Sequence, residues 1–201
     1  MNGGRHLAHL AWALAAAGAV LVAGASPHEA PALITPEQAQ HAAWQGFADK
    51  LPLHPAALRE AAAGTAAAPP LLVERIDRRG SFYYIVPFTR QGRTTLVVLV
   101  DAHDGSFKEA AGRSDPRPYP AIDEARARSI LRSALAGTAG SGTMPPGRPN
   151  LVWKPSAASQ SPYEPIWRFR QDGRTWYVDQ QGRLLDQIAE PEMKGGGPPH
   201  R

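Results

Sequence analysis

The chain has 201 residues, a formal net charge of +4 and no cysteine. Its length suits one medium domain or two small ones. The absence of cysteine excludes disulfides, thiolate metal sites and a lipid-modified cysteine. Basic and acidic residues are interleaved without a basic stripe, and this slight positive excess argues against a nucleic-acid-binding protein.

The first 25 residues are typical of a signal peptide. Arg5 is the only charged residue among them, and an apolar run over residues 7–25 follows it. The run ends in Ala23-Gly24-Ala25, a small-x-small pattern that signal peptidase accepts, so cleavage is predicted between Ala25 and Ser26. The mature chain is then periplasmic or secreted. The alternative is an uncleaved inner-membrane anchor, because residues 7–25 are just long enough to cross a bilayer.

A helix is predicted over approximately residues 35–51. Thr35 is a good N-cap, Pro36 suits the first helical position, and Gln38 completes a Thr-x-x-Gln capping box. Small and apolar residues recur at helical spacing through this segment, and Pro52 ends it. A short helical turn is expected in HPAALREAAAG, before an Ala/Pro-rich stretch that ends at Pro70.

An antiparallel meander is predicted over approximately residues 71–109. Its strands are LLVERID, SFYYIVPFTR, TTLVVLVDA and the short SFKEA, separated by turns that contain Gly. The uninterrupted run Leu96–Val100 predicts a strand that is covered on both faces. Pro87 predicts a sheet edge or a bulge in the neighbouring strand. The segment GRSDPRPYP is expected to be a connector.

The order of elements then repeats. An amphipathic helix is predicted over approximately residues 121–136, with Gly137 as its C-terminal stop. Strands follow over about 150–188. The Asp172-Gly173 turn pairs Phe169 with Trp176 and Trp167 with Val178, so that apolar side chains share one face. The other face then carries Arg168, Arg170, Thr175 and Tyr177. The Gly/Pro-rich tail over 190–201 is expected to be disordered.

Two segments carry one pattern: LVVLVDAHDGSFKEA at 96–110 and TWYVDQQGRLLDQ at 175–187. Each reads as an apolar strand, Val-Asp, a turn ending in Gly and a second strand. A helix followed by a meander with this last hairpin resembles the PepSY domain family. ITPEQA and FYYIVPF also carry the resemblance in the first copy, and IWRFR in the second, more degenerate one. The second turn is one residue shorter, and the Ala/Pro insertion in the first copy is unusual.

The resemblance covers Thr35 to about Ala111 and about Ala121 to Ile188, nearly all of the mature chain. It implies an α+β fold of two helix-on-antiparallel-sheet units (PepSY/cystatin-like). Unit 1 would span 26–116 and unit 2 would span 117–189, between the signal peptide 1–25 and the tail 190–201. It implies binding or inhibition of other proteins and no catalytic residues. The sequence leaves open whether the two units share one sheet.

No constellation of residues predicts catalysis, a cofactor or a metal site. The histidines of the mature chain lack metal-site spacing with one another, and His103 lies in a turn beside Asp101 and Asp104. These carboxylates are expected to accept backbone N–H groups of the turn. There is no Gly-x-Ser-x-Gly motif, and AGSGTMPPG lacks the lysine of a phosphate-binding loop. An enzyme is therefore not expected.

The aromatic and arginine side chains of the strands are the remaining candidates. Packing between elements explains them, and the alternative is a partner-binding surface. That surface would contain Tyr83, Tyr84, Arg168, Arg170 and Tyr177. Adjacent in one strand, Tyr83 and Tyr84 are expected on opposite faces.

The leading hypothesis is an exported, non-enzymatic protein that binds or restrains another envelope protein, with a peptidase as one candidate. Docking by a sheet edge that accepts a strand is one mechanism. The second hypothesis is a periplasmic protein that senses a small ligand or a metal ion in a pocket between helix and sheet. No nucleic-acid partner is expected. Contact with a membrane is expected only if the signal segment is not cleaved.

Overall fold

The computed structural model describes residues 32–136, 147–171 and 173–190. The predicted signal peptide with its Ala25–Ser26 cleavage site, Gly137, Asp172 and the tail from 191 lie outside these ranges. Among the described helices, none has the length and apolar character needed to cross a bilayer. The elements are α1 (Pro36–Asp49), η1 (Leu51–Leu53), α2 (Ala56–Ala62), β1 (Ala66–Ala67), β2 (Leu71–Arg75), β3 (Ser81–Arg90), β4 (Arg93–Asp101), β5 (Phe107–Arg117), α3 (Glu124–Ala136), β6 (Asn150–Trp153), β7 (Ile166–Gln171), β8 (Arg174–Val178) and β9 (Leu184–Leu185).

The strands form one sheet in the order β5-β4-β3-β2-β6-β7-β8-β9, and β1 pairs with β3 beyond the end of β2. The fold is therefore α+β with a large, mainly antiparallel sheet, as expected. The pairing of β2 with β6 is parallel and joins the two halves of the chain, with Val73 opposite Leu151 and Arg75 opposite Trp153. The described halves thus share one sheet.

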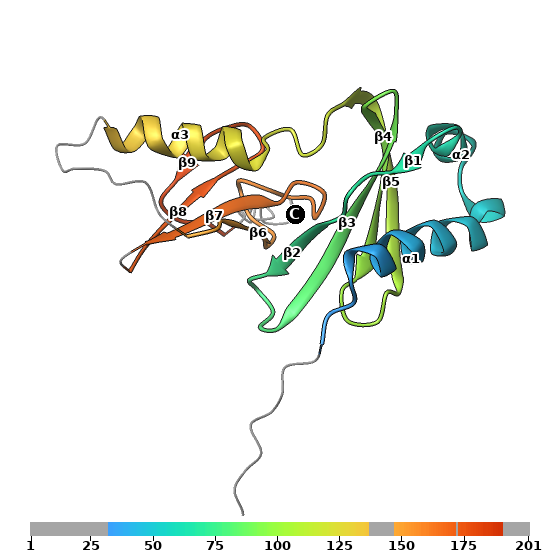
Figure 1. Cartoon of the computed structure of the whole chain (residues 1–201), viewed down its shortest axis with the longest axis horizontal. Coiled ribbons are helices and arrows are strands. Elements are labelled where there is room, and N and C mark those ends of the chain that lie inside the picture. Colours follow the sequence, from blue (N-terminus) through green and yellow to red (C-terminus); the bar gives the residue numbers. More distant parts are fainter. Residues whose placement is uncertain (1–31, 137–146, 172, 191–201) are drawn as a thin grey trace, which may run out of the picture.

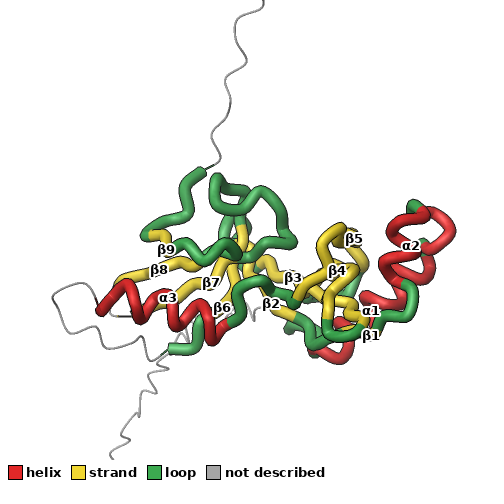
Figure 2. Tube along the Cα trace, turned by 90° about the horizontal axis from the view of Figure 1, so that it is seen from above, coloured by secondary structure: helices red, strands yellow, loops and turns green. Residues whose placement is uncertain are grey.

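The helices lie on opposite faces of this sheet. At one end α1 and α2 cover β3, β4 and β5, and at the other end α3 lies against β8 and β9 (Figure 1; Figure 2). The α1-side core contains Tyr84, Val86, Phe88, Leu96, Val98 and Val100. The α3-side core runs across the junction through a row of directly paired residues, Tyr83, Val73, Leu151, Trp167 and Val178. Strand alternation therefore separates the two cores.

Helix α1 begins as the sequence predicts. The Thr35 side chain accepts a hydrogen bond from the Gln38 N–H, and the Gln38 side chain accepts one from the Thr35 N–H. Its buried stripe is Ala39, Ala43 and Phe47. The α-helix ends at Asp49 rather than near 51, because Pro52 lacks an N–H and its ring would clash with the preceding turn. A 3₁₀ turn replaces the last residues.

The central strands bear out two expectations. Leu96–Val100 is buried throughout, with alternate side chains in the two cores. Pro87 lies between the end of the β2 pairing at Ile85 and the start of the β1 pairing at Phe88, next to a register shift in the β3–β4 ladder. A missing N–H is tolerated where the neighbouring strand changes.

Strand β5 corrects one expectation. The sequence predicted a strand ending near 109 and a connector through GRSDPRPYP, whereas β5 runs over 11 residues, Phe107–Arg117. Its pairing with β4 continues to Thr94 opposite Arg117, and an irregularity between Thr94 and Leu96 absorbs the extra residues. Pairing with a neighbouring strand here overrides the turn-forming composition.

In both Val-Asp turns the Asp carboxylate accepts the N–H of the residue two positions later. The Asp101 carboxylate accepts the His103 N–H at 2.8 Å, and the Asp179 carboxylate accepts the Gln181 N–H at 3.0 Å. Gly105 and Gly182 close the turns with φ of 72° and 78°, a region that favours glycine. The carboxylates therefore shape the turns, as the sequence predicts.

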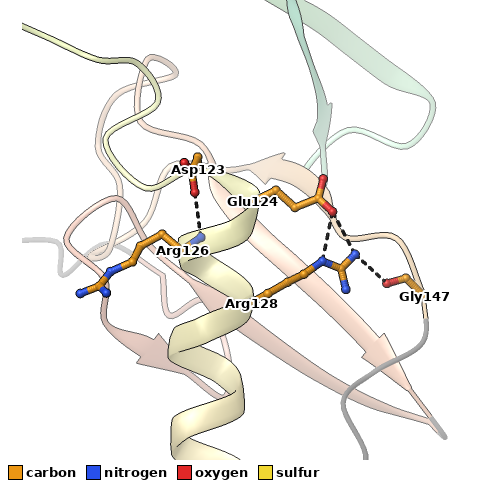
Figure 3. A network of polar contacts seen from close by, with 5 residues as sticks. All are labelled: Asp123, Glu124, Arg126, Arg128 and Gly147. Carbon is orange, nitrogen blue, oxygen red and sulfur yellow. Dashed lines mark hydrogen bonds and ion pairs between the residues drawn. The ribbon is translucent and has the colours of Figure 1, made fainter.

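The second half follows the predicted register, since Phe169 pairs with Trp176 and Trp167 with Val178. Figure 3 shows the start of α3, where the Asp123 carboxylate accepts the Arg126 N–H at 2.7 Å. Arg128 is bound to the Glu124 carboxylate at 2.9 Å and donates to the Gly147 carbonyl at 3.3 Å. Arg128 thereby ties the helix to the segment that leads into β6.

Candidate functional site

Three of the five predicted surface residues are buried, which corrects their assignment to a docking surface. Tyr83, Tyr84 and Arg168 are only 6%, 5% and 6% exposed. The two tyrosines point to opposite faces, as expected, and both are inside. The Tyr83 hydroxyl donates to the Pro162 carbonyl at 2.8 Å, and the Tyr84 hydroxyl donates to the Ile34 carbonyl at 3.0 Å. A partner cannot reach these side chains in the folded chain.

Arg168 joins three strands. Its guanidinium forms an ion pair with the Glu74 carboxylate of β2 at 2.5 Å and donates to the Asn150 side chain of β6 at 3.2 Å. The Asn150 amide also donates to Glu74 at 3.1 Å. This network lies at the junction of the two halves, which pair through β2 and β6. Arg168 therefore holds the sheet together and does not present its charge to solvent.

The other two predicted residues remain partly available. Arg170 is exposed on β7. Tyr177 is half-buried and packs against a small cluster of Val152, Ile166 and Ile188. The predicted aromatic and arginine surface is thus reduced to one exposed cation and part of one ring.

The titratable groups of the interior have structural roles. Burial raises the pKa values of the Tyr83, Tyr119 and Tyr163 hydroxyls, and the nearby Glu109 carboxylate adds to the shift of Tyr163. The Tyr119 hydroxyl donates to the Tyr163 carbonyl. Over the described residues, no three His, Asp or Glu side chains are grouped as metal ligands would be. His103 bonds the Gly80 carbonyl, and His54 stacks on Phe47.

The free edge of β5 is the most accessible binding feature. In the described sheet β5 and β9 are the outermost strands, and β9 has only two residues. The regular part of the β5 ladder is Glu109–Gly112, in which Glu109, Ala110, Ala111 and Gly112 face Leu99, Val98, Val97 and Leu96. We call Glu109–Arg113, which adds the next residue of β5, the β5 edge. An edge strand presents N–H and C=O groups without strand partners.

Alternation identifies the groups that face outward. The Asp101 N–H donates to Ser106 on the β5 side, and the Ala102 N–H donates to Phe82 on the β3 side. Hydrogen-bonding direction alternates along a strand, so Leu99 and Val97 bond Glu109 and Ala111. The N–H and C=O groups of Ala110 and Gly112 therefore point away from β4, toward the free edge.

An apolar groove of about 680 Å³ runs beside this edge, beneath α2. It exists because small residues line it from both sides, Ala57 and Ala61 from α2 and Ala110 and Gly112 from β5. A Cβ on Gly112 would lie 3.4 Å from Ala61 and Leu58. The outward backbone groups of Ala110 and Gly112 thus border an apolar hollow wide enough for side chains of a partner.

Two side-chain nitrogens are unpartnered within the described chain, His54 Nε2 at the groove and Arg113 Nε beside Tyr119 on the other face of β5. Both atoms are buried. The Arg113 guanidinium lies 5.6 Å from the Tyr119 ring centroid, and none of the described carboxylates lies within salt-bridge distance of it. Arg113 therefore offers a charge to an acceptor supplied from outside. Sequence reasoning missed this site because it assigned Arg113 to a connector.

A smaller hollow of about 220 Å³ lies on the α3 side of the sheet, with Arg75, Lys108 and Trp153 in its lining. Two of its cations are already paired, because Arg75 binds Asp77 and Lys108 binds Asp101. Arg75 also stacks over Trp153 at 4.8 Å. This hollow is therefore a poorer candidate than the β5 edge.

No family model, curated protein or solved structure matches the chain. The described fold and site define an α+β protein whose best-developed binding feature is a free strand beside an apolar groove.

Proposed function

We propose that this chain is an exported, non-enzymatic, PepSY-like protein that binds or restrains another envelope protein, with a peptidase as a candidate partner. The observation that carries the proposal is the β5 edge, with outward backbone groups beside an apolar groove of about 680 Å³. In strand addition, main-chain hydrogen bonds supply affinity and adjoining hollows select side chains. The β5 edge offers both.

A division into two related units, 26–116 and 117–189, is part of this proposal. It is supported by the helix that packs on strands in each half and by the matching hydrogen bonds at Asp101 and Asp179. The parallel β2–β6 pairing would then join the units into one sheet. The halves differ in the sheet face that their helices cover.

Export is the other part. The apolar run over residues 7–25 and the small residues before Ser26 favour a cleaved signal peptide. The mass of the protein recovered from the periplasm tests this directly. Cleavage after Ala25 gives a chain that begins at Ser26, whereas a full-length protein in the inner-membrane fraction would support the anchor over residues 7–25.

The docking function is tested by site-directed cross-linking, which the absence of cysteine makes clean. Ser114→Cys places a thiol on an exposed residue that lines the groove, and Arg174→Cys places one at the exposed start of β8, near the far end of the sheet. Each variant is exported, and a thiol-reactive photo-cross-linker is attached in intact cells. Adducts are identified by mass spectrometry.

We expect an envelope protein to be captured from Ser114→Cys and not from Arg174→Cys. Ala110→Pro should suppress the adduct, because it removes an outward N–H and leaves the β4 ladder intact. Failure to capture any protein other than a second copy, or equal capture from both positions, would overturn the proposed function.

A second candidate is a periplasmic protein that binds a small apolar ligand in the same groove, whose volume lies in the range of small-molecule sites. Thermal-shift measurements with a ligand panel separate the two, since a ligand specific for the native state raises the melting temperature. A shift abolished by Gly112→Val would favour this second function.

A further inference from the structure

We infer that the β5 edge pairs with the β5 edge of a second copy of this chain, antiparallel and centred on Ala111. The two sheets then become one continuous sheet across a two-fold axis. This pairing does not depend on the proposed function, because it requires only the backbone and charges of Glu109–Arg113. Because dimer formation would cover the β5 edge, the fraction of chains with a free edge would depend on protein concentration.

The hydrogen-bonding alternation selects the register. Residues with outward N–H and C=O groups must face each other across the new interface, and on this edge they are Ala110 and Gly112. With Ala111 on the two-fold axis, Ala110 of one copy faces Gly112 of the second copy. Both residues then exchange hydrogen bonds. A shift by one residue would set outward groups against residues already bonded to β4.

Charge complementarity selects the same register. With Ala111 on the axis, Glu109 lies directly opposite Arg113 of the second copy, and the symmetry gives two such pairs per dimer. Directly opposite side chains of opposite charge stabilise a strand pair. Centring on Gly112 would instead oppose Glu109 with Asp115, and centring on Ala110 would oppose Arg113 with Phe107. Of the three registers centred on Ala110, Ala111 and Gly112, only the one centred on Ala111 sets Glu109 opposite Arg113.

The surroundings of the edge suit this partner. Arg113 has no carboxylate within salt-bridge distance among the described residues of its own chain, and a second copy supplies one. Glu109 is exposed and forms no salt bridge within the described chain. The two-fold axis puts both α2 helices and their apolar grooves on one side of the joined sheet. Leu53, 83% exposed and one residue before groove-lining His54, stands beside this region.

A single cysteine tests the geometry. In the Ala111→Cys variant, position 111 of one copy lies opposite position 111 of the second copy in a non-hydrogen-bonded pair. The two Cα atoms of such a pair lie about 4.5 Å apart, which is within the range for a disulfide. We expect the protein recovered from the periplasm to form a disulfide-linked dimer under mild oxidation. Arg174→Cys, on the opposite end of the sheet, is the matched control. If Ala111→Cys is folded and links no faster than Arg174→Cys, the inferred register is wrong.

Charge reversal tests the energetics. Glu109→Arg and Arg113→Glu each set like charges opposite each other, and we expect each to raise the dimer dissociation constant roughly tenfold or more. The double variant restores opposite charges and should return to within about threefold of the parent. Glu109→Gln removes the charge and keeps the side-chain size, and its dissociation constant should fall in between. Sedimentation over a range of concentrations provides the measurement, and circular dichroism verifies folding.

A parent protein that stays monomeric at all concentrations tested would overturn the inference, as would failure of the double variant to restore the dimer. Either result leaves the proposed docking function standing, because that function is read from adducts with a different protein. Conversely, if the protein dimerises but captures no different protein, the docking function is wrong and the inferred dimer stands.

Discussion

Replacing Arg168 with methionine should weaken the junction between the two halves of the sheet. The Arg168 side chain is 6% exposed and binds Glu74 of β2 and Asn150 of β6. Methionine keeps most of the aliphatic volume and removes the charge. The Glu74 carboxylate then keeps only the Asn150 amide as a partner across the junction.

The expected cost follows from the burial of both groups. Breaking one partner of a fully buried ion pair costs about 3–5 kcal/mol. The Glu74 side chain is 30% exposed, so water can solvate part of the unpaired carboxylate. We therefore expect Arg168→Met to lower the free energy of unfolding by about 2–3 kcal/mol. Replacing both residues by methionine should cost only about 1 kcal/mol, since no unpaired charge remains.

Urea unfolding of the purified protein, followed by tryptophan fluorescence, measures these free energies. Arg170→Met is the matched control, because Arg170 is exposed on the same strand, and its effect should stay within about 0.5 kcal/mol. The reasoning is refuted if Arg168→Met costs no more than Arg170→Met. It is also refuted if the double variant is less stable than Arg168→Met alone.

Three further predictions concern the core. Gly46→Ala should cost about 1–3 kcal/mol in the same unfolding assay, because its Cβ would lie 2.4 Å from the Cβ of Phe107; an unchanged midpoint would contradict this packing. Asp179→Ala should cost about 2 kcal/mol, since the buried carboxylate accepts N–H groups of Gln181 and Arg183, whereas Asp104→Ala in the exposed turn should cost less. Burial raises the folded-state pKa of several tyrosines above the unfolded value of about 10, so their contribution to stability is complete below pH 10 and is lost as the pH rises through the folded values. Phenolate absorbance should therefore appear at higher pH in the native than in the denatured protein; coincident titration curves would disprove the burial of Tyr83, Tyr119 and Tyr163.

Features that depend on neighbouring residues were accessible from the sequence. The Thr35–Gln38 capping box, the register of the β7–β8 hairpin and the turn-shaping role of Asp101 each involve groups within a few residues of one another. The burial of Leu96–Val100 on both faces followed from an unbroken apolar run. Such features are set by local hydrogen bonds and by periodicity, so one segment contains all the information.

Features that join distant segments were decided by the tertiary structure. Arg168 is an apparent surface cation in its own hairpin, and only the parallel β2–β6 pairing brings Glu74, 94 residues away, to within 2.5 Å of it. Strand β5 extends to Arg117 against its local turn composition because β4 supplies a continuous partner. The groove beneath α2 exists because small residues from two elements meet there. Burial and pairing between distant segments contribute more free energy than local preference at these positions, and one segment alone does not encode them.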